Sequence, residues 1–171
     1  MKKILLSNIC YALLIPCFLL FSFTTVNNRA NFSGDWKLDE SKSELGNAAG
    51  RTARSLKAEQ KDNDITISRT TPGFNGGDPV TTTYTVTYDG KVTESEGFGG
   101  SKRKSTAKWS DDGLTLTINS VMTFERDGQT TEIKRTEVWK LSDGGKVLTI
   151  ESTSNFGGNE NKQKFVYDKV N

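Results

Sequence analysis

The chemistry open to this chain is set first by the residue types that it lacks. The 171 residues include no histidine, and the two cysteines, Cys10 and Cys17, both lie in a hydrophobic N-terminal stretch. Catalytic Cys–His pairs and Ser–His–Asp triads need an imidazole, and zinc sites in proteins are built mostly from histidine and cysteine. The sequence therefore excludes these classes of enzyme and metal site, and it predicts neither a cofactor nor a bound metal.

Three of the remaining ionisable residues alternate with hydrophobic ones. Arg69 ends the alternating run Ile65–Arg69, and Arg135 and Glu137 alternate within Ile133–Leu141. Residues two apart in a strand share a face, so these charges are expected to face a hydrophobic core. An unpaired buried charge is costly, and such a group is therefore paired or lies near water.

Two interpretations of these charges stay open. In the first, Arg135 and Glu137 pair with each other as a structural ion pair near one end of the fold. In the second, Arg135 acts with Tyr84 or Tyr88 to hold the carboxylate of a ligand, because a guanidinium matches a carboxylate in bidentate geometry. Glu137 and Arg69 would line the same site. A one-residue bulge would reverse the facing and remove this assignment.

The elements that must position these side chains are predicted to be β-strands. From residue 31 onward, about ten alternating segments are separated by short turns, with no long amphipathic helix. The clearest strand is Val80–Tyr88. It is followed by Asp89-Gly90, a dipeptide typical of two-residue hairpins with positive φ at both turn positions, and then by a return strand at Lys91–Glu96. We expect an all-β fold, an antiparallel up-and-down β-barrel of about 8–10 strands. A β-sandwich is the alternative.

The turns fall into two kinds when they are assigned alternately to the two ends of such a meander. One end receives mainly tight turns led by aspartate, and the other receives mainly longer, glycine-rich connections. Three of the longer connections carry a phenylalanine beside glycines, namely Phe74, Phe98 and Phe156. These rings either surround a ligand portal, since binding sites favour barrel mouths, or cover the core as a lid. The two roles are compatible.

Residues 1–26 are predicted to be a secretory signal peptide. Two lysines precede an apolar run over residues 4–23, which is the order found in such signals. We expect cleavage between residues 22 and 30, leaving a barrel domain of residues 31–171 without a membrane span. The expected location is outside the cytoplasm, either periplasmic or secreted. A membrane anchor is one alternative, since the run approaches the ~20 residues that a span needs, and a lipid attached at Cys17 is a less favoured one.

The charge balance argues against a nucleic-acid partner. The chain has 23 basic and 21 acidic residues, and loss of Lys2, Lys3 and Arg29 would leave 20 basic ones and a net charge of −1. Nucleic-acid-binding domains carry a clear positive excess. The basic run at residues 102–104, with Lys108, is interpreted as the solvated face of a strand.

The first strand carries the most specific motif. Residues 31–43 read NFSGDWKLDESKS, and they place Gly34 and Trp36 on one face. Glycine inside a strand is typical of a bend, a bulge or a close backbone approach, and Trp36 is suited to plug one end of a core. Gly-x-Trp at the start of a β meander resembles the opening of lipocalin-like (calycin) barrels. The longer run resembles the opening of secreted bacterial lipocalin-like proteins.

This resemblance implies a barrel over about residues 32–169 that holds a small, partly hydrophobic molecule. Lipocalin-like and fatty-acid-binding barrels use interior arginine and tyrosine to hold ligand acids, which would give Arg135 and the tyrosines that role. The leading hypothesis is an exported barrel that binds a hydrophobic or amphipathic ligand at its loop-rich end and is not an enzyme.

Two other functions stay open. A filled barrel serving as a structural or protein-interaction module would be favoured if the tyrosines met in the middle with the structural tryptophans, Trp36, Trp109 and Trp139. An enzyme using the buried ionic residues or a tyrosine for acid–base chemistry is supported by no motif. The sequence does not set the oligomeric state.

Overall fold

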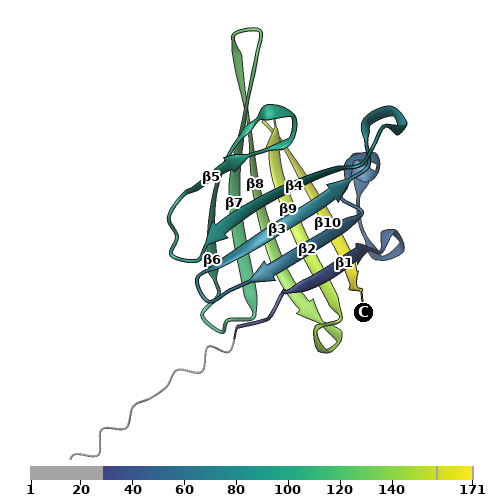
Figure 1. Cartoon of the computed structure of the whole chain (residues 1–171), viewed down its shortest axis with the longest axis vertical. Helices are drawn as coiled ribbons and strands as arrows, with labels where there is room; N and C mark the ends of the chain where they lie inside the picture. The colour runs from purple at the N-terminus through teal and green to yellow at the C-terminus, as the bar shows by residue number, and fades with distance from the viewer. Residues whose placement is uncertain (1–28, 157, 171) are drawn as a thin grey trace, which may run out of the picture.

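The computed structural model describes residues 29–156 and 158–170, which form one ten-stranded antiparallel sheet (Figure 1). The predicted signal peptide, residues 1–26, lies outside the described residues. The strands are β1 (Gly34–Leu38), β2 (Ser55–Gln60), β3 (Asp64–Thr71), β4 (Val80–Thr87), β5 (Thr93–Glu96), β6 (Lys102–Trp109), β7 (Thr115–Arg126), β8 (Gln129–Ser142), β9 (Val147–Phe156) and β10 (Asn159–Lys169). Short 3-10 helices lie in the connections: η1 (Glu40–Lys42), η2 (Gly46–Arg51), η3 (Phe74–Gly76), η4 (Phe98–Gly100) and η5 (Asp143–Gly145).

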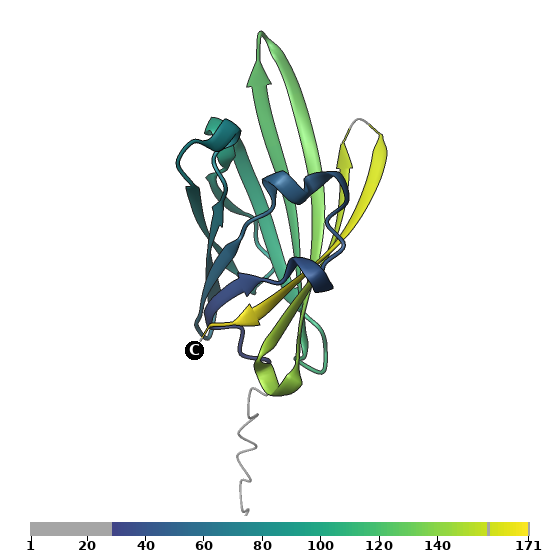
Figure 2. The ribbon, with the colours of Figure 1, turned by 90° about the vertical axis from the view of Figure 1, so that its right-hand side faces the viewer.

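The strand order is β4-β3-β2-β1-β10-β9-β8-β7-β6-β5, so every pairing joins consecutive strands except that of β1 with β10. The sheet curls until β1–β4 pass in front of β7–β10 (Figure 1), and the side view shows the resulting two layers (Figure 2). The expectation of an all-β, antiparallel, up-and-down arrangement is confirmed. The sheet is a near-barrel, because no ladder joins its edge strands β4 and β5 within the described residues.

The expected hairpin at Asp89-Gly90 is wrong. Gly90 has a φ of 75° but Asp89 does not have a positive φ, so the turn lacks the two left-handed residues that a tight hairpin of this kind needs. The Asp89 carboxylate instead accepts hydrogen bonds from the Thr87 hydroxyl (2.7 Å) and the Lys91 backbone N–H (3.1 Å). This local turn separates β4 from β5 and leaves an open seam between them.

The closed end of the near-barrel is filled by aromatic side chains. Phe32 is fully buried; its ring stacks on Trp109 at 5.6 Å and meets the edge of Trp139 at 5.7 Å. The Trp36 indole N–H donates to the Phe32 carbonyl oxygen (3.0 Å). Trp36 and Trp139 have no exposed surface and Trp109 is 9% exposed, so all three tryptophans belong to the core.

Gly34 lies where the chain approaches β10 closely. Its φ is 141°, a conformation that side-chain-bearing residues rarely adopt, and an added Cβ would stand 2.8 Å from Cε of Lys169. The expectation of a close approach at this glycine agrees with the structure.

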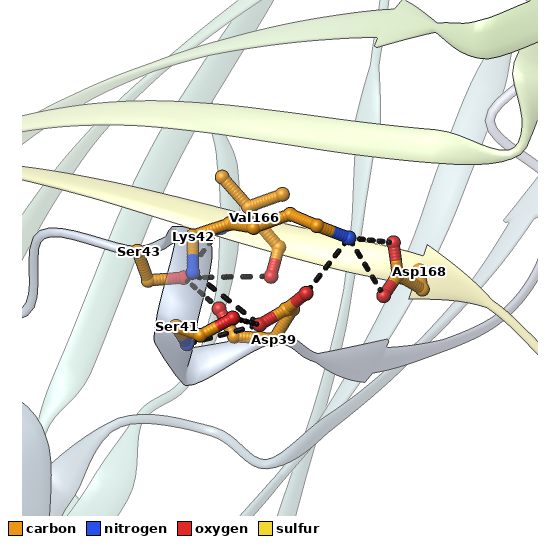
Figure 3. Close-up of polar contacts among 6 residues, drawn as sticks. All are labelled: Asp39, Ser41, Lys42, Ser43, Val166 and Asp168. Atoms are coloured by element: carbon orange, nitrogen blue, oxygen red, sulfur yellow. Dashed lines mark hydrogen bonds and ion pairs between the residues drawn. The ribbon is translucent and has the colours of Figure 1, made fainter.

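A polar network ties the connection between β1 and β2 to the outside of β10 (Figure 3). Asp39 caps η1 by accepting from the backbone N–H groups of Ser41 (2.9 Å) and Lys42 (3.3 Å). The Lys42 ammonium pairs with Asp39 (2.8 Å) and with Asp168 of β10 (3.2 Å), and the hydrogen bonds from Lys42 and Ser41 hold the pKa of Asp39 below its usual range. The Ser43 hydroxyl accepts from the β10 backbone N–H of Val166 (2.9 Å). These contacts fix the long connection without filling the barrel.

Candidate functional site

The inner face of β8 changes character from the closed end to the mouth. Trp139 is fully buried, Glu137 is 4% exposed, and the side chain of Arg135 is 32% exposed. Ile133 follows at the mouth and is half-buried. The interior therefore has an apolar floor, a polar layer above it, and a rim open to solvent. The polar layer is defined here by eight side chains: Arg69, Tyr84, Arg103, Ser105, Ser120, Arg135, Glu137 and Ser152.

The carboxylate of Glu137 is the anionic centre of the polar layer. It accepts two hydrogen bonds from the Arg69 guanidinium, from Nη1 to Oε1 at 2.8 Å and from Nη2 to Oε2 at 2.6 Å. The Trp139 indole N–H donates to the same Oε2 at 3.2 Å. Arg135 Nη1 stands 4.0 Å from Oε1, at the outer limit of an ion pair. Glu137 thus pairs primarily with Arg69 of β3, across the interior, and only weakly with its neighbour on β8.

The electrostatic environment keeps this pair ionised. Burial raises the pKa of Glu137, but the charge and hydrogen bonds of Arg69, with the charge of Arg135 and the Trp139 N–H, outweigh it and lower the pKa from 4.5 to about 2. Burial likewise lowers the pKa of Arg69, and the charge of Glu137 more than reverses this and raises it. Both groups are therefore charged throughout the physiological range.

Arg103 belongs to the polar layer although the sequence interpretation placed it on a solvated strand face. Its guanidinium lies over the Tyr84 ring, 4.2 Å from the ring centroid, and so joins β6 to β4 across the open edge of the sheet. Its Nη2 contacts the Met122 sulfur at 3.7 Å. Alternation in the sequence could have predicted its inward position, because Arg103 shares the face of the buried Ala107 and Trp109. Burial raises the pKa of Tyr84, so its hydroxyl stays neutral.

Several buried polar atoms of this layer have no hydrogen-bond partner among the described residues. They are the Nε atoms of Arg69, Arg103 and Arg135 and the hydroxyl of Ser152. The Ser105 and Ser120 hydroxyls lie 3.0 Å apart and bond to each other. Native proteins satisfy the large majority of buried polar groups, so four unpaired atoms in one layer indicate a place where a polar ligand or water completes the structure.

The structure separates the two tyrosines that the sequence placed on one face. Tyr88 lies at the closed end, where its ring meets Trp109 at 5.5 Å and Arg29 stands over it at 5.2 Å. Four residues along a strand correspond to about 13 Å, which puts Tyr88 a full layer away from Tyr84. Tyr88 is therefore not part of the polar layer, whereas Arg69, Tyr84, Arg135 and Glu137 do come together there.

The three phenylalanines all belong to connections at the loop-rich end. Phe74 begins η3, Phe98 begins η4 and Phe156 ends β9, and in an antiparallel meander these connections share one end. Their side chains lie outside what the structure describes, so the portal and lid roles remain predictions. Half-buried Met122, Phe124 and Ile133 supply apolar surface on the described inner faces above the polar layer.

Two hollows lie at the surface. One, of about 480 Å³, lies over β6–β9 and is lined mainly by polar residues that include Lys104, Asn119 and Lys134, together with Ser105, Ser120 and Arg135 of the polar layer. The other, of about 500 Å³, lies at the closed end beside Arg29 and Tyr88.

In the described part of the chain, no three His, Cys, Asp or Glu residues group as metal ligands, and no helix has the length and apolar character to cross a membrane.

Comparison with known proteins gives one similar fold. A crystal structure of the zebrafish ileal bile acid-binding protein in complex with cholic acid resembles this chain with a TM-score of 0.49 and 19% sequence identity, covering 81% of this chain and 98% of that one. No protein-family model and no curated protein matches the sequence. The function is accordingly argued from this chain's own residues.

Proposed function

We propose that this protein is an exported lipocalin-like barrel that binds a small amphipathic anion, with the acidic group in the polar layer and the hydrophobic part toward the mouth. The observation that carries the proposal is the charge of the polar layer. Three guanidiniums, those of Arg69, Arg103 and Arg135, lie in this layer with one carboxylate, that of Glu137.

The excess charge has a physical cost that a ligand would offset. Arg69 uses both terminal nitrogens on Glu137, which leaves Arg135 at 4.0 Å and Arg103 against an aromatic ring. Partly buried charges without a counter-ion are destabilising. An anionic group that accepts hydrogen bonds from Arg103 and Arg135 would remove that cost, and these hydrogen bonds would be charge-assisted.

The route and the apolar contacts are also present. The side chain of Arg135 is 32% exposed, so solvent reaches the polar layer. Above it, Met122, Phe124 and Ile133 are only half-buried. Methionine adapts to ligands of varied shape, and burial of an apolar group against these side chains would contribute about 25 cal/mol per Å². A molecule with an acidic head and a hydrophobic body fits this arrangement.

Native mass spectrometry of the protein purified gently from its own host tests the binding role. We expect an extra mass that is released on denaturation. The matched variants are Arg135→Ala, in the polar layer, and Arg126→Ala, whose side chain is 92% exposed at the β7–β8 turn. Arg135→Ala should lose the bound mass while keeping its far-UV circular dichroism, and Arg126→Ala should keep both. Retention of the ligand by Arg135→Ala would contradict the proposed site.

Export is tested separately, by the intact mass and N-terminal sequence of the protein recovered outside the cytoplasm. We expect an N-terminus between residues 23 and 31. A full-length chain in the membrane fraction would support an anchor instead.

The alternative, a filled barrel with a structural role, is favoured by one observation. The aromatic cluster of Phe32, Trp109 and Trp139 fills the closed half of the interior. A single mass under native and denaturing conditions, together with no uptake of a hydrophobic fluorescent probe, would select this alternative.

A further inference from the structure

We propose that the group held in the polar layer is a dianion of the phosphate monoester class, and not a carboxylate. This inference rests on the proposed function and specifies the head group of its ligand.

The charge count of the layer supports a dianion. Three guanidiniums and one carboxylate leave two positive charges, because arginine does not deprotonate in proteins and the Glu137 carboxylate is already engaged by Arg69. A carboxylate ligand would cancel one of these charges and a phosphate monoester, with a charge of −1.5 to −2 at neutral pH, would cancel both. Since uncompensated buried charge is what destabilises the layer, the dianion is the better complement.

The number and placement of donors support a phosphate as well. In the strand register Ser105, Ser120 and Arg135 form one row across β6, β7 and β8. Ser152 stands beside Glu137 in the adjoining row, and Arg103 lies one position nearer the mouth than Ser105 on the inner face of β6. Guanidinium and hydroxyl donors are thus spread over neighbouring strands.

The unpaired atoms add to this. The Nε atoms of Arg103 and Arg135 and the buried Ser152 hydroxyl, 2% exposed as a residue, have no partner among the described residues. A carboxylate presents two oxygens in one plane, whereas a phosphate presents three strong acceptor oxygens in a tetrahedral arrangement. The tetrahedral group can meet donors that arrive from several strands.

The protein itself does not titrate between pH 5.5 and 8 at this place. The groups that face the layer are Arg69 from β3, Tyr84 from β4, Arg103 from β6, Arg135 and Glu137 from β8, and Tyr167 from β10. The pKa of Glu137 is lowered to about 2, that of Tyr84 is raised, and burial raises that of Tyr167 to about 12. Burial lowers the pKa of Arg103, but a guanidinium remains charged. The chain has no histidine. Any pH dependence of binding in this window therefore belongs to the ligand.

Isothermal titration calorimetry with octyl phosphate, octyl sulfate and octanoate at pH 5.5 and 8 tests the inference. Octyl phosphate gains its second charge in this window, since the second pKa of a phosphate monoester is about 6. About a quarter of octyl phosphate is already dianionic at pH 5.5. If the second charge tightens binding by about tenfold, in line with one further close charge pair, we expect the dissociation constant to fall by about threefold at pH 8, and those of octyl sulfate and octanoate to change by less than about 1.5-fold. Octanoate binding as tightly as octyl phosphate at pH 8 would overturn the inference and leave the proposed function intact.

Variants place the effect in the polar layer. Arg103→Met removes a guanidinium that has no carboxylate partner, and it should reduce the affinity for octyl phosphate at pH 8 to that for octyl sulfate. Ser152→Ala, a smaller change, should weaken octyl phosphate more than octanoate, and Arg126→Ala should alter neither. Equal losses for all three ligands in Ser152→Ala and Arg103→Met would overturn the inference.

Inorganic phosphate distinguishes a free anion from an amphipathic ligand. We expect it to bind at least about tenfold more weakly than octyl phosphate, because it lacks the apolar group that would meet the mouth. Equal binding would contradict the amphipathic ligand of the proposed function while supporting the dianionic head group. Failure of all four compounds to bind would overturn both.

Discussion

Replacing Glu137 with glutamine tests how the interior is held together. The substitution keeps the shape of the side chain and removes the charge that pairs with Arg69. The guanidinium of Arg69 would then lie among buried groups with no counter-ion within hydrogen-bonding distance. Because its side chain is 17% exposed, it retains some access to water at the mouth.

Two independent lines give similar magnitudes. Breaking a buried ion pair by removing one partner costs about 3–5 kcal/mol, and the partial exposure of Arg69 favours the lower end. A carboxyl whose pKa falls from 4.5 to about 2 on folding contributes about 3 kcal/mol at neutral pH. Because the pKa is lower in the folded state, this contribution is complete above about pH 4.5 and is lost as the pH falls toward 2.

Urea denaturation followed by tryptophan fluorescence measures the effect. We expect Glu137→Gln to lose about 3 kcal/mol of unfolding free energy at pH 7, with an unchanged m-value, and the difference from the wild type to shrink as the pH falls from 4.5 toward 2. Glu132→Gln, on the same strand but exposed, should change stability by less than about 0.5 kcal/mol. The double variant Arg69→Met/Glu137→Leu should recover most of the loss, since apolar replacements of buried pairs are often neutral. A loss below about 1 kcal/mol, or one independent of pH, would refute this account of the pair.

Three further predictions concern the frame around the site. Phe32→Ala should cost about 3–5 kcal/mol in the same assay, because it opens a cavity against Trp109 and Trp139; a cost under 1 kcal/mol would show that the closed end can collapse. Gly34→Ala should cost about 1–3 kcal/mol because of its φ of 141°, and the loss should persist when Lys169 is also changed to alanine, which removes the steric contact; recovery in that double variant would assign the cost to the contact instead. Asp39→Ala should speed limited trypsin cleavage after Arg51, since it removes the cap of η1; an unchanged cleavage rate would show that the other contacts of this connection suffice.

The strand pattern predicted most of this architecture because alternation depends only on local sequence. It correctly placed Arg69, Arg135 and Glu137 on the core side of their strands. It did not identify the pair, because Arg69 and Glu137 are 68 residues apart and meet only when the sheet curls. Proximity in sequence favoured Arg135, whose geometry on the same strand leaves it at 4.0 Å.

Two errors show where alternation stops being informative. Tyr84 and Tyr88 do share a face, but a shared face says nothing about depth, and they lie in different layers. Arg103 was assigned with the lysines on either side of it as one charged run, although its facing is opposite to theirs. The charged composition of residues 102–104 suggested a solvated face, whereas the position of Arg103 in the alternating strand indicated that it faces inward. The open seam between β4 and β5 could not be predicted from the dipeptide Asp89-Gly90. The dipeptide favours a tight hairpin, whereas the Asp89 carboxylate accepts hydrogen bonds from Thr87 and Lys91 in a turn of another kind.

The pairing of β1 with β10 has a consequence for how the molecule reaches its folded state. Strands β1–β4 and β5–β10 are each built from neighbours in sequence, so both can form as they emerge from the ribosome, but the ladder that unites them joins Trp36 to Lys169. Such a distant contact carries the largest loop-closure entropy in the sheet and is expected to form late. The chain therefore cannot complete its core until its last strand has been synthesised. For a protein exported as proposed above, an incomplete core would leave the chain easier to unfold for transfer across a membrane. A circular permutant that joins the ends of the chain at β1 and β10 and opens it at residues 89–92 would make every strand pair sequential. We expect this permutant to fold faster than the natural chain.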